Sequence, residues 1–323
     1  MSANPWVMTV LVLVAVAVLI EGLRRFQLYR LQPQRNMEEF DGPVYRVGSA
    51  HVSVRASADA PHCSVICMHG FMEDHRYFTD FYRDPDIDLI LMTSADYHPP
   101  VAGLKAANAT WGVEPPWRPG TIEYDAHVLN QVLEHLPRTD RVRLHGHSRG
   151  GAVVIEAANQ RPELHDGSGR QVEVVLEAPV LPQGEPHPYL AATLNPVGRW
   201  LLPFVMPLYK RLPFDLYAKR LYGEVSGRKR ELLSQIYFNP RRYATIVVNA
   251  ISISEWMAAH DHHSFKVCAS GVIVVGEDER ILDREAMLAS ARQAGKRFKV
   301  LEPAGTTHFV IQDKPEAVPG PFA

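Results

Sequence analysis

The sequence predicts an α/β fold with a mostly parallel sheet, and three observations lead to that class. Short apolar runs typical of buried strands recur from residue 44 onward and alternate with helical patterns. A serine stands between glycines at Gly146–Gly150, where one of these runs gives way to a helix-like stretch. The alternation stops at Pro179 and resumes after Phe265. Alternating strands and helices form parallel sheets flanked by helices, so we expect one α/β core with an insertion.

The composition sets outer bounds on the fold and its partners. A chain of 323 residues suits one α/β domain with an insertion. The formal net charge of −2 gives no basic excess, which argues against a nucleic-acid partner. The three cysteines, Cys63, Cys67 and Cys268, are odd in number and lack metal-ligand spacing. We therefore expect buried thiols and a reducing compartment.

Residues 1–25 are predicted to be a membrane anchor. Between residues 6 and 20 only Thr9 is polar. As a helix this run would span about 22 Å, against roughly 30 Å of hydrocarbon, and extension to Leu23 nearly closes that gap. Residues 1–5 carry no positive charge, unlike a secretory signal peptide. A buried helix of a soluble domain is the alternative.

Arginines follow the apolar segment directly, at positions 24, 25, 30 and 35. The positive-inside rule then places the rest of the chain in the cytoplasm, as a single-pass protein of the cell membrane. Membrane lipid is therefore an expected partner through this segment. Residues 26–43 are predicted to be a linker that leads to the core.

The core is predicted to begin at Val44. Residues 44–55 alternate apolar and polar side chains, like an antiparallel hairpin at the edge of a sheet. Helical spacing of apolar residues predicts a helix over Thr121–Leu136. Short apolar runs predict strands at 64–68, 88–93, 142–146, 172–178, 271–276 and 298–302. The core therefore comprises residues 44–178 and 266–323.

The insertion, residues 179–265, is rich in proline and aromatic residues and is predicted to be a mainly helical cap. Between Arg199 and Arg242 it carries ten Lys or Arg and three Asp or Glu. A basic, aromatic cap on an anchored protein could lie against anionic headgroups. The alternative is an ordinary cap that covers a pocket and turns its charges to water, and we prefer it.

The Gly146–Gly150 stretch, GHSRG, fits a nucleophilic serine. A serine hydroxyl is a poor nucleophile unless it is exposed, near a base and beside donors for an oxyanion. A sharp strand-to-helix turn would expose Ser148 above the sheet edge, and the close backbone approach tolerates little beyond glycine at the flanks. The positive end of the following helix favours negative charge there. By itself the motif fits a turn without a catalytic role equally well, because glycine and serine are common in turns.

Residues elsewhere supply partners for this serine. The HGF loop, His69–Phe71, follows an early strand, so the backbone N–H groups of Phe71 and Arg149 can form a two-donor oxyanion hole. His308 follows the last predicted strand, and it would take the Ser148 proton and return it to the leaving group. The stretch Gly276–Arg280 places carboxylates at the end of a strand, where an acid that orients His308 belongs.

With these motifs the chain resembles the α/β-hydrolase superfamily over about residues 44–316. The matching motifs are HGF at His69–Phe71, GHSRGG at Gly146–Gly151, GEDER at Gly276–Arg280 and the GTTHF histidine, His308. The resemblance implies the α/β-hydrolase fold, with a mostly parallel central sheet, flanking helices and an inserted helical cap. It implies Glu279 as the triad acid by position, ahead of Asp278, although family members typically carry aspartate there. Glu177 is a third candidate, because some related enzymes have the acid at that strand end.

The sequence thus predicts a membrane-anchored serine hydrolase that cleaves a carboxylic ester or thioester with an apolar part through an acyl-enzyme. The substrate would be a small, amphiphilic ester, and the mechanism needs no cofactor or metal. Carbon–carbon bond hydrolysis or perhydrolysis on the same triad is one alternative. A catalytically silent, membrane-tethered binding module is the other.

Other polar residues receive plainer interpretations. The run His260–His263 looks like a metal cluster, but adjacent histidines in a polar loop do not easily converge on one ion. His147 is expected to pack against neighbours or to line the pocket. Asp74 and His75 are assigned to loop structure, and Asp96–His98 to the pocket wall.

Overall fold

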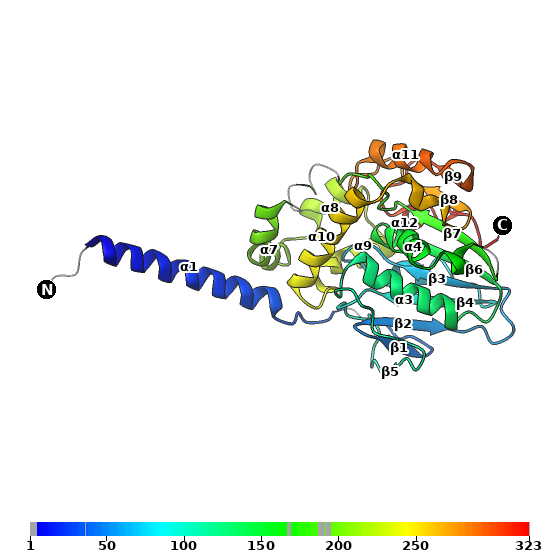
Figure 1. Ribbon diagram of the computed structural model, residues 1–323, viewed down its shortest axis with the longest axis horizontal. Coiled ribbons are helices and arrows are strands. Elements are labelled where there is room, and N and C mark those ends of the chain that lie inside the picture. The colour runs from blue at the N-terminus through cyan, green and yellow to red at the C-terminus, as the bar shows by residue number, and fades with distance from the viewer. Residues whose placement is uncertain (1–4, 36, 167–168, 187–190, 192–194, 323) are drawn as a thin grey trace.

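A computed structural model of the protein describes residues 5–35, 37–166, 169–186, 191 and 195–322 (Figure 1). Within these described residues, nine strands form one sheet in the order β5-β1-β2-β4-β3-β6-β7-β8-β9. The β1–β2 and β2–β4 pairs are antiparallel and the other pairs are parallel, which confirms the predicted mostly parallel sheet. The strands are β1 (Val44–Val47), β2 (Ala50–Arg55), β3 (Cys63–Met68), β4 (Ile87–Thr93), β5 (Ala106–Asn108), β6 (Arg141–His147), β7 (Gln171–Glu177), β8 (Gly271–Val274) and β9 (Phe298–Leu301).

The β1–β2 hairpin is present, but its predicted place at the edge of the sheet is wrong. β5 pairs with β1 in parallel and forms the outermost strand. Its three residues, Ala-Ala-Asn, are all exposed. A strand this short and this polar carries no apolar pattern, so nothing in the sequence distinguishes it from a loop.

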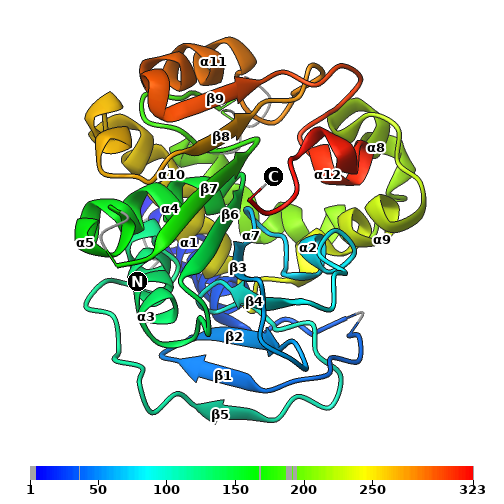
Figure 2. The same ribbon diagram turned by 90° about the vertical axis from the view of Figure 1, so that its right-hand side faces the viewer.

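Helices cover both faces of the sheet (Figure 2). On one face, α3 and α4 share an apolar core with β3 and β6. On the other, α2 and α12 contribute to a second core that continues into the insertion. The three cysteines are free and buried in these cores, as predicted. The helices of the core are α2 (Arg76–Thr79), α3 (Ile122–His135), α4 (Arg149–Gln160), α5 (Pro162–His165), α11 (Arg284–Gln293) and α12 (Val310–Asp313), with short turns η3 (Gly295–Arg297) and η4 (Pro315–Ala317).

The region between β7 and β8 is helical, as the sequence predicts. It contains α7 (Pro196–Tyr209), α8 (Asp215–Tyr222), α9 (Gly227–Gln235) and α10 (Tyr243–Ala259), with turns η1 (Ile236–Phe238) and η2 (His262–Lys266). Figure 1 shows these helices gathered at one end of the molecule. Their apolar residues cover the second core, so the insertion is packed on the sheet domain. The boundaries at residues 179 and 265 remain predictions.

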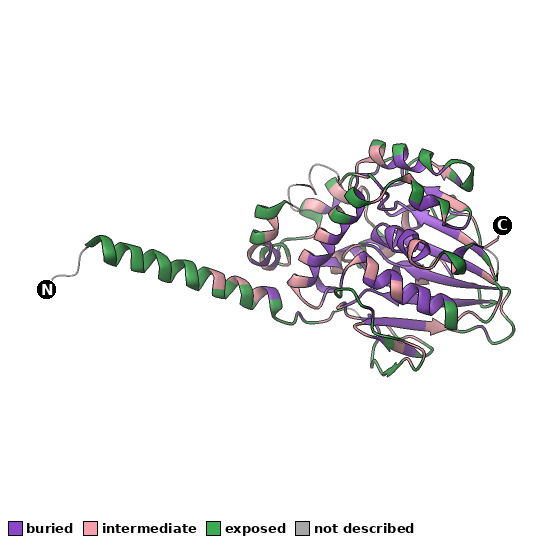
Figure 3. Cartoon of the chain, viewed as in Figure 1, coloured by how far each residue is buried: buried purple, intermediate pink, exposed green. Residues whose placement is uncertain are grey.

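The N-terminal helix α1 (Pro5–Tyr29) projects from the end of the molecule that carries α7 (Figure 1). Its 25 residues would measure about 37 Å, and it continues past the predicted boundary at residue 25. The most apolar part of α1 has none of its residues buried, and Figure 3 shows the exposed length. The end of the helix is docked, because Leu28 is buried and α1 contacts α7 and α10. The helix is therefore not a buried element of a soluble core.

Candidate active site

Ser148 stands at the turn from β6 into α4. Its backbone has a φ of +53° and a ψ of −119°, which is a strained conformation for a residue with a side chain. Three hydrogen bonds hold the turn. The Ser148 N–H donates to the Glu177 carbonyl, and the Ser148 carbonyl accepts from the N–H groups of Gly151 and Val180, each at 2.9 Å. A turn of this kind raises the serine hydroxyl above the edge of the sheet.

The flanking glycines are required by space, as expected. A Cβ at Gly150 would lie 2.0 Å from the Met68 carbonyl oxygen, which belongs to β3. A Cβ at Gly146 would lie 2.4 Å from the Gly150 carbonyl oxygen. Both neighbours are backbone atoms that cannot rotate away. The end of β3 therefore touches the serine turn directly, and this contact brings the HGF loop beside Ser148.

His308 follows β9, and its Nδ1 atom lies 2.7 Å from Oε2 of Glu279. The other oxygen of Glu279 accepts the N–H groups of Ile281 at 2.7 Å and Leu282 at 3.0 Å. Burial by itself would raise the pKa of the Glu279 carboxyl, but the charge of His308 and these hydrogen bonds lower it. Glu279 can thus hold the ring through Nδ1 as a carboxylate and leave Nε2 available for proton transfer.

The two other candidate acids do not reach His308. The Asp278 side chain is 55% exposed and lies 4.0 Å from Arg280. Glu177 is fully buried, where it accepts hydrogen bonds from the Tyr77 hydroxyl at 2.5 Å and the Ile311 N–H at 2.9 Å. The positional choice of Glu279 over both is thus consistent with the geometry.

Two backbone N–H groups are available beside Ser148, at Phe71 and Arg149. Within the described part of the chain, neither has a hydrogen-bond acceptor. The Arg149 side chain is occupied separately, because its guanidinium donates to Asp125 at 2.7 Å and to the Gly120 carbonyl at 3.1 Å. This buried ion pair joins the start of α4 to α3. It fixes the N-terminus of α4, whose positive end favours an anion.

Ser148, His308 and Phe71 line one cavity of about 520 Å³. Its wall is mostly apolar and comes largely from the insertion: Leu201, Leu202, Val205, Met206, Tyr209, Leu221, Leu233, Ile236, Tyr237, Ile246 and Ala250. A larger, open hollow lined by Asp166 and Lys296 does not include the serine or the histidine. Among the contacts of the described residues, no hydrogen bond joins the Ser148 hydroxyl to His308. Such a bond often forms only with substrate in place.

A buried pair beside the serine, Glu73 with His147, is absent from the sequence prediction. Nδ1 of His147 lies 2.7 Å from Oε2 of Glu73, and that oxygen also accepts the Gly70 N–H at 3.0 Å. Nε2 of His147 lies 2.9 Å from the His308 carbonyl, and Tyr77 stacks on the ring at 4.2 Å. His147 thus connects the HGF loop, the serine turn and the histidine loop.

The protonation of this pair follows from its charges. Burial alone would lower the pKa of the His147 ring, but the charge of Glu73 and their hydrogen bond raise it to about 9. His147 is therefore an imidazolium at neutral pH, and both ring nitrogens donate. The expectation that His147 packs is right. The sequence carries one signal for this pair: a histidine directly before the serine, and a carboxylate two residues after the HGF motif.

The remaining polar candidates lie outside the active site. Asp74 pairs with Arg76 at 2.7 Å, and His75 lies 3.1 Å from the Thr93 hydroxyl, so both belong to loop structure as predicted. The placement of Asp96–His98 in the pocket wall is wrong. None of the three lines the cavity, and the Tyr97 hydroxyl instead joins Met72 to α10.

The histidine run does converge, contrary to the expectation from adjacency. The ligand atoms of Asp261, His262 and His263 lie within 4.8 Å of one another. All three side chains are exposed, and Asp261 accepts the His263 N–H at 2.8 Å at the start of η2. An exposed carboxylate at a helix start is explained by this capping role.

Residues 65–318 match the family model described as "Alpha/beta hydrolase family". No curated protein matches the chain significantly in sequence. The match covers the serine turn, Glu279 and His308, and it extends across the helical insertion.

Solved structures share the fold at low identity. A carboxylesterase from Bacillus subtilis is 16% identical with a TM-score of 0.54, over 93% of this chain and 94% of that one. A structure described as a putative lipase from Acinetobacter baumannii is 13% identical with a TM-score of 0.59, over 93% and 91%. A bacterial membrane phospholipase A is 16% identical with a TM-score of 0.58, over 96% and 94%.

Proposed function

Because the chain belongs to the alpha/beta hydrolase family, we propose that it is a serine hydrolase that cleaves a carboxylic ester or thioester with an apolar part. The observation that carries this proposal is the 2.7 Å bond between the buried Glu279 and His308, which lines the same cavity as Ser148 at its strained turn. The apolar wall supports an apolar acyl or alcohol group in the substrate.

The proposed mechanism proceeds through an acyl-enzyme. Nε2 of His308 accepts the Ser148 proton as the hydroxyl oxygen attacks the carbonyl carbon, and Glu279 stabilises the imidazolium. The N–H groups of Phe71 and Arg149 bind the oxyanion. The bond to the alcohol or thiol then breaks, and His308 returns the proton to that leaving group. In the second half His308 takes a proton from water as the water oxygen attacks the acyl carbon. The bond from the acyl carbon to Ser148 Oγ then breaks, and His308 gives that proton to Oγ, which releases the acid and restores Ser148.

A fluorophosphonate probe tests the nucleophile. Wild-type protein should be labelled, and both Ser148→Ala and His308→Ala should lose labelling and ester turnover while remaining folded at the assay temperature. A series of p-nitrophenyl esters of increasing chain length then measures the preferred acyl group. A folded wild-type protein that no probe labels would instead indicate a silent binding module. Carbon–carbon hydrolysis or perhydrolysis would use the same triad, and no observation favours either.

We infer further that α1 anchors the protein in the cell membrane with the hydrolase body in the cytoplasm. Support comes from the exposed apolar length of α1 and the arginines that follow it. The buried native cysteines make labelling specific, because an impermeant thiol reagent has no exposed target in the wild type. In intact cells Ser2→Cys should be labelled from outside and Val113→Cys should be protected. The reverse pattern would place the body outside the cytoplasm.

A further inference from the structure

Helices α7 and α8 expose large apolar side chains at the end of the molecule from which α1 projects (Figure 1). We call five exposed residues the cap-tip patch: Val197, Trp200 and Leu208 on α7, Leu212 between the two helices, and Leu216 on α8. Val197 is 67% exposed and Leu216 is 72% exposed. Large exposed apolar patches on a protein surface mark sites of interaction with a partner or a membrane, and these five side chains all belong to one stretch of the insertion, residues 197–216.

We propose that the cap-tip patch and the end of α1 form one docking surface for an anionic bilayer, through which a membrane-resident lipid ester reaches Ser148. This inference rests on the proposed function, because it names the substrate class of the same site. Its structural basis is separate and consists of three features: the two faces of α7, a cluster of unpaired cations, and the rigid attachment of α1.

Helix α7 separates the cavity from the outside with a different set of side chains on each face. Val197, Trp200, Phe204 and Leu208 recur at three- and four-residue intervals, which places them along one side. Leu202, Val205 and Met206 line the cavity instead. Leu201 and Tyr209 belong to both sets, because each is exposed on the outside and also lines the cavity. At these two residues the cavity wall reaches the outer surface of α7, beside the cap-tip patch, and the exposed Arg220 and Arg280 also line the cavity.

Cations gather where α1 meets the end of α7. Lys210 donates to Gln32 at 3.1 Å, and its ammonium and the Arg35 guanidinium lie 4.5 and 4.0 Å from the ring centre of Phe238. Burial and the charges of Arg35 and Arg30 lower the pKa of Lys210 to about 8. Among the described residues no carboxylate forms an ion pair with these three cations, whereas Arg24 and Arg25 both pair with Glu21.

An unpaired cation cluster at the end of an apolar helix fits the phosphate level of an anionic bilayer. Cations at that depth interact with phospholipid phosphates while adjacent apolar side chains enter the acyl region. The same bilayer that holds α1 would thereby hold the cap-tip patch. This continuity favours lipid over a second copy of the chain as the occupant.

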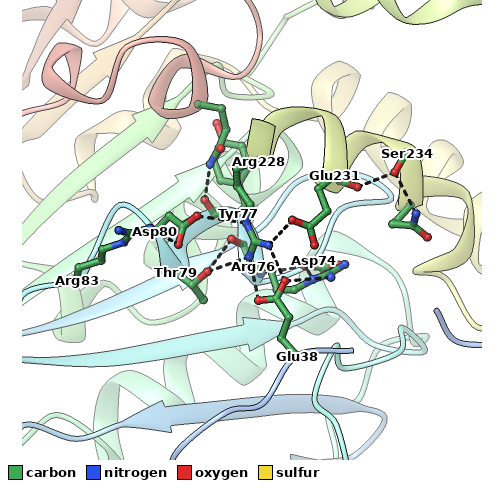
Figure 4. A network of polar contacts seen from close by, with 12 residues as sticks. Glu38, Asp74, Arg76, Tyr77, Thr79, Asp80, Arg83, Arg228, Glu231 and Ser234 are labelled. Carbon is green, nitrogen blue, oxygen red and sulfur yellow. Dashed lines mark hydrogen bonds and ion pairs between the residues drawn. The ribbon is translucent and has the colours of Figure 1, made fainter. Parts of the chain in front are cut away.

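The attachment of α1 to the body is rigid enough to fix this orientation. After α1, the Gln32 N–H donates to the Arg241 carbonyl at 2.8 Å. The Glu38 carboxylate then accepts a hydrogen bond from the guanidinium of Arg228 in α9 at 2.5 Å. The same carboxylate lies 3.4 Å from the Arg76 guanidinium (Figure 4). The segment predicted to be a simple linker is therefore clamped between the core and the insertion. A helix perpendicular to the bilayer would consequently set which face of the body meets the lipid.

Site-specific labels test the docking directly. A polarity-sensitive fluorophore is attached to Leu216→Cys or Val197→Cys in full-length protein reconstituted in vesicles, and Val113→Cys is the matched control. Val113 is 66% exposed but lies beside α3, where its backbone pairs with Gln131. The cap labels should shift to the blue and be quenched by brominated acyl chains, and the control should not. Cap labels that behave like the control would overturn the docking surface.

Charge variants test the lipid chemistry. Vesicles of phosphatidylcholine, with or without phosphatidylglycerol, carry a long-chain fluorogenic ester, and p-nitrophenyl butyrate reports soluble turnover. Phosphatidylglycerol should raise turnover of the vesicle ester. In Arg30→Gln or Arg35→Gln, the ratio of the rate with phosphatidylglycerol to the rate without it should fall by about fivefold. Lys299→Gln on the exposed edge strand β9 is the control. Equal rates with both vesicle types would overturn the anionic-lipid assignment.

Two further readouts separate the outcomes. The label experiment on Ser148→Ala protein reports docking without any turnover, so a blue shift there with no esterase activity in the wild type would retain the docking surface and reject the proposed function. A blue shift that appears only at high protein density in the vesicles would indicate a second copy on the patch and overturn the lipid assignment.

Discussion

At the scale of single residues, the candidate triad depends on which carboxylate faces His308. Glu279 is buried and contacts the ring, whereas the neighbouring Asp278 is exposed. Glu279→Gln should lower kcat for a soluble ester by about a hundredfold or more, because the amide cannot stabilise the imidazolium. Asp278→Asn, one residue away, is the matched control and should change kcat less than about twofold. Steady-state kinetics on both variants measure the difference.

The opposite order would show that the loop is shifted by one residue. A loss confined to Glu177→Gln would move the acid to the end of β7. In that variant a reduced unfolding midpoint must be measured alongside kcat, because Glu177 also holds Tyr77 and Ile311.

The Glu73–His147 pair should make stability depend on alkaline pH. The pKa of His147 is raised to about 9 in the folded protein from an ordinary value near 6.5. A raised pKa contributes stability that is complete below pH 6.5 and is lost as pH rises through 9. Urea unfolding in detergent micelles should therefore show a loss of about 3 kcal/mol across that range.

Glu73→Gln provides the control for this titration. It removes the charge that holds the proton on His147, while Glu177, the Tyr77 ring and the His308 carbonyl remain around the imidazole. The variant should be less stable at pH 6.5 and should show a smaller decline toward pH 9. An unchanged pH slope would mean that His147 is not protonated in the folded protein.

At the scale of elements, the contact between β3 and the serine turn depends on Gly150. A methyl group there would lie 2.0 Å from the Met68 carbonyl oxygen. Gly150→Ala should destabilise the protein by about 3 kcal/mol and reduce turnover, because the HGF loop would move away from Ser148. Gly320→Ala, where a Cβ meets no atom within 4 Å, should leave the unfolding midpoint and kcat unchanged. Thermal unfolding and ester kinetics report both effects.

The helices of the insertion together form one wall of the cavity. These helices supply most of the apolar wall, while the core supplies Ser148, His308 and the backbone donors. Substitutions in α7 should therefore alter the preference for acyl length more than the chemistry, in keeping with a family in which chemistry and specificity come from different parts of the fold.

At the scale of the whole molecule, removal of residues 2–20 should leave a folded protein that high salt releases from the membrane. The deletion takes away the apolar half of α1 but keeps Leu28 and the end that contacts α7 and α10. High salt should not extract the full-length protein, because ions do not screen apolar burial. The shortened protein should hydrolyse p-nitrophenyl butyrate normally and lose turnover of a vesicle-borne ester, since the tether raises the local substrate concentration.

Fractionation before and after the deletion provides the measurement. Recovery of the full-length protein in the soluble fraction without detergent would contradict the anchor. Equal turnover of the vesicle ester by both forms would show that the tether does not present the substrate.

The sequence by itself determined the α/β class, the mostly parallel strands, the helical insertion and the apolar N-terminal helix, while the exposure of that helix came from the structure. Each of these depends on local pattern, such as apolar runs or helical spacing, that neighbouring residues carry together. The turn at Ser148 was equally readable, because glycines on both sides of a serine report a close backbone approach wherever the chain folds. The exposed strand β5 was not predicted, because its residues carry no such pattern.

Only the tertiary structure decided what depends on distant residues meeting. The resemblance named Glu279 as the acid for His308 but left two alternatives, and the bond between them joins residues 29 positions apart. The bonds of Glu73 to His147 and of Glu38 to Arg228, 74 and 190 positions apart, had no counterpart in the sequence prediction. Sequence periodicity describes patterns within a single helix or strand, so it does not indicate which distant residues come into contact. The same limit applies to the cap-tip patch, because apolar residues on α7 are equally suited to a buried core. Whether they face the cavity or the outside depends on how the helix lies over the sheet, and that orientation is a property of the whole fold.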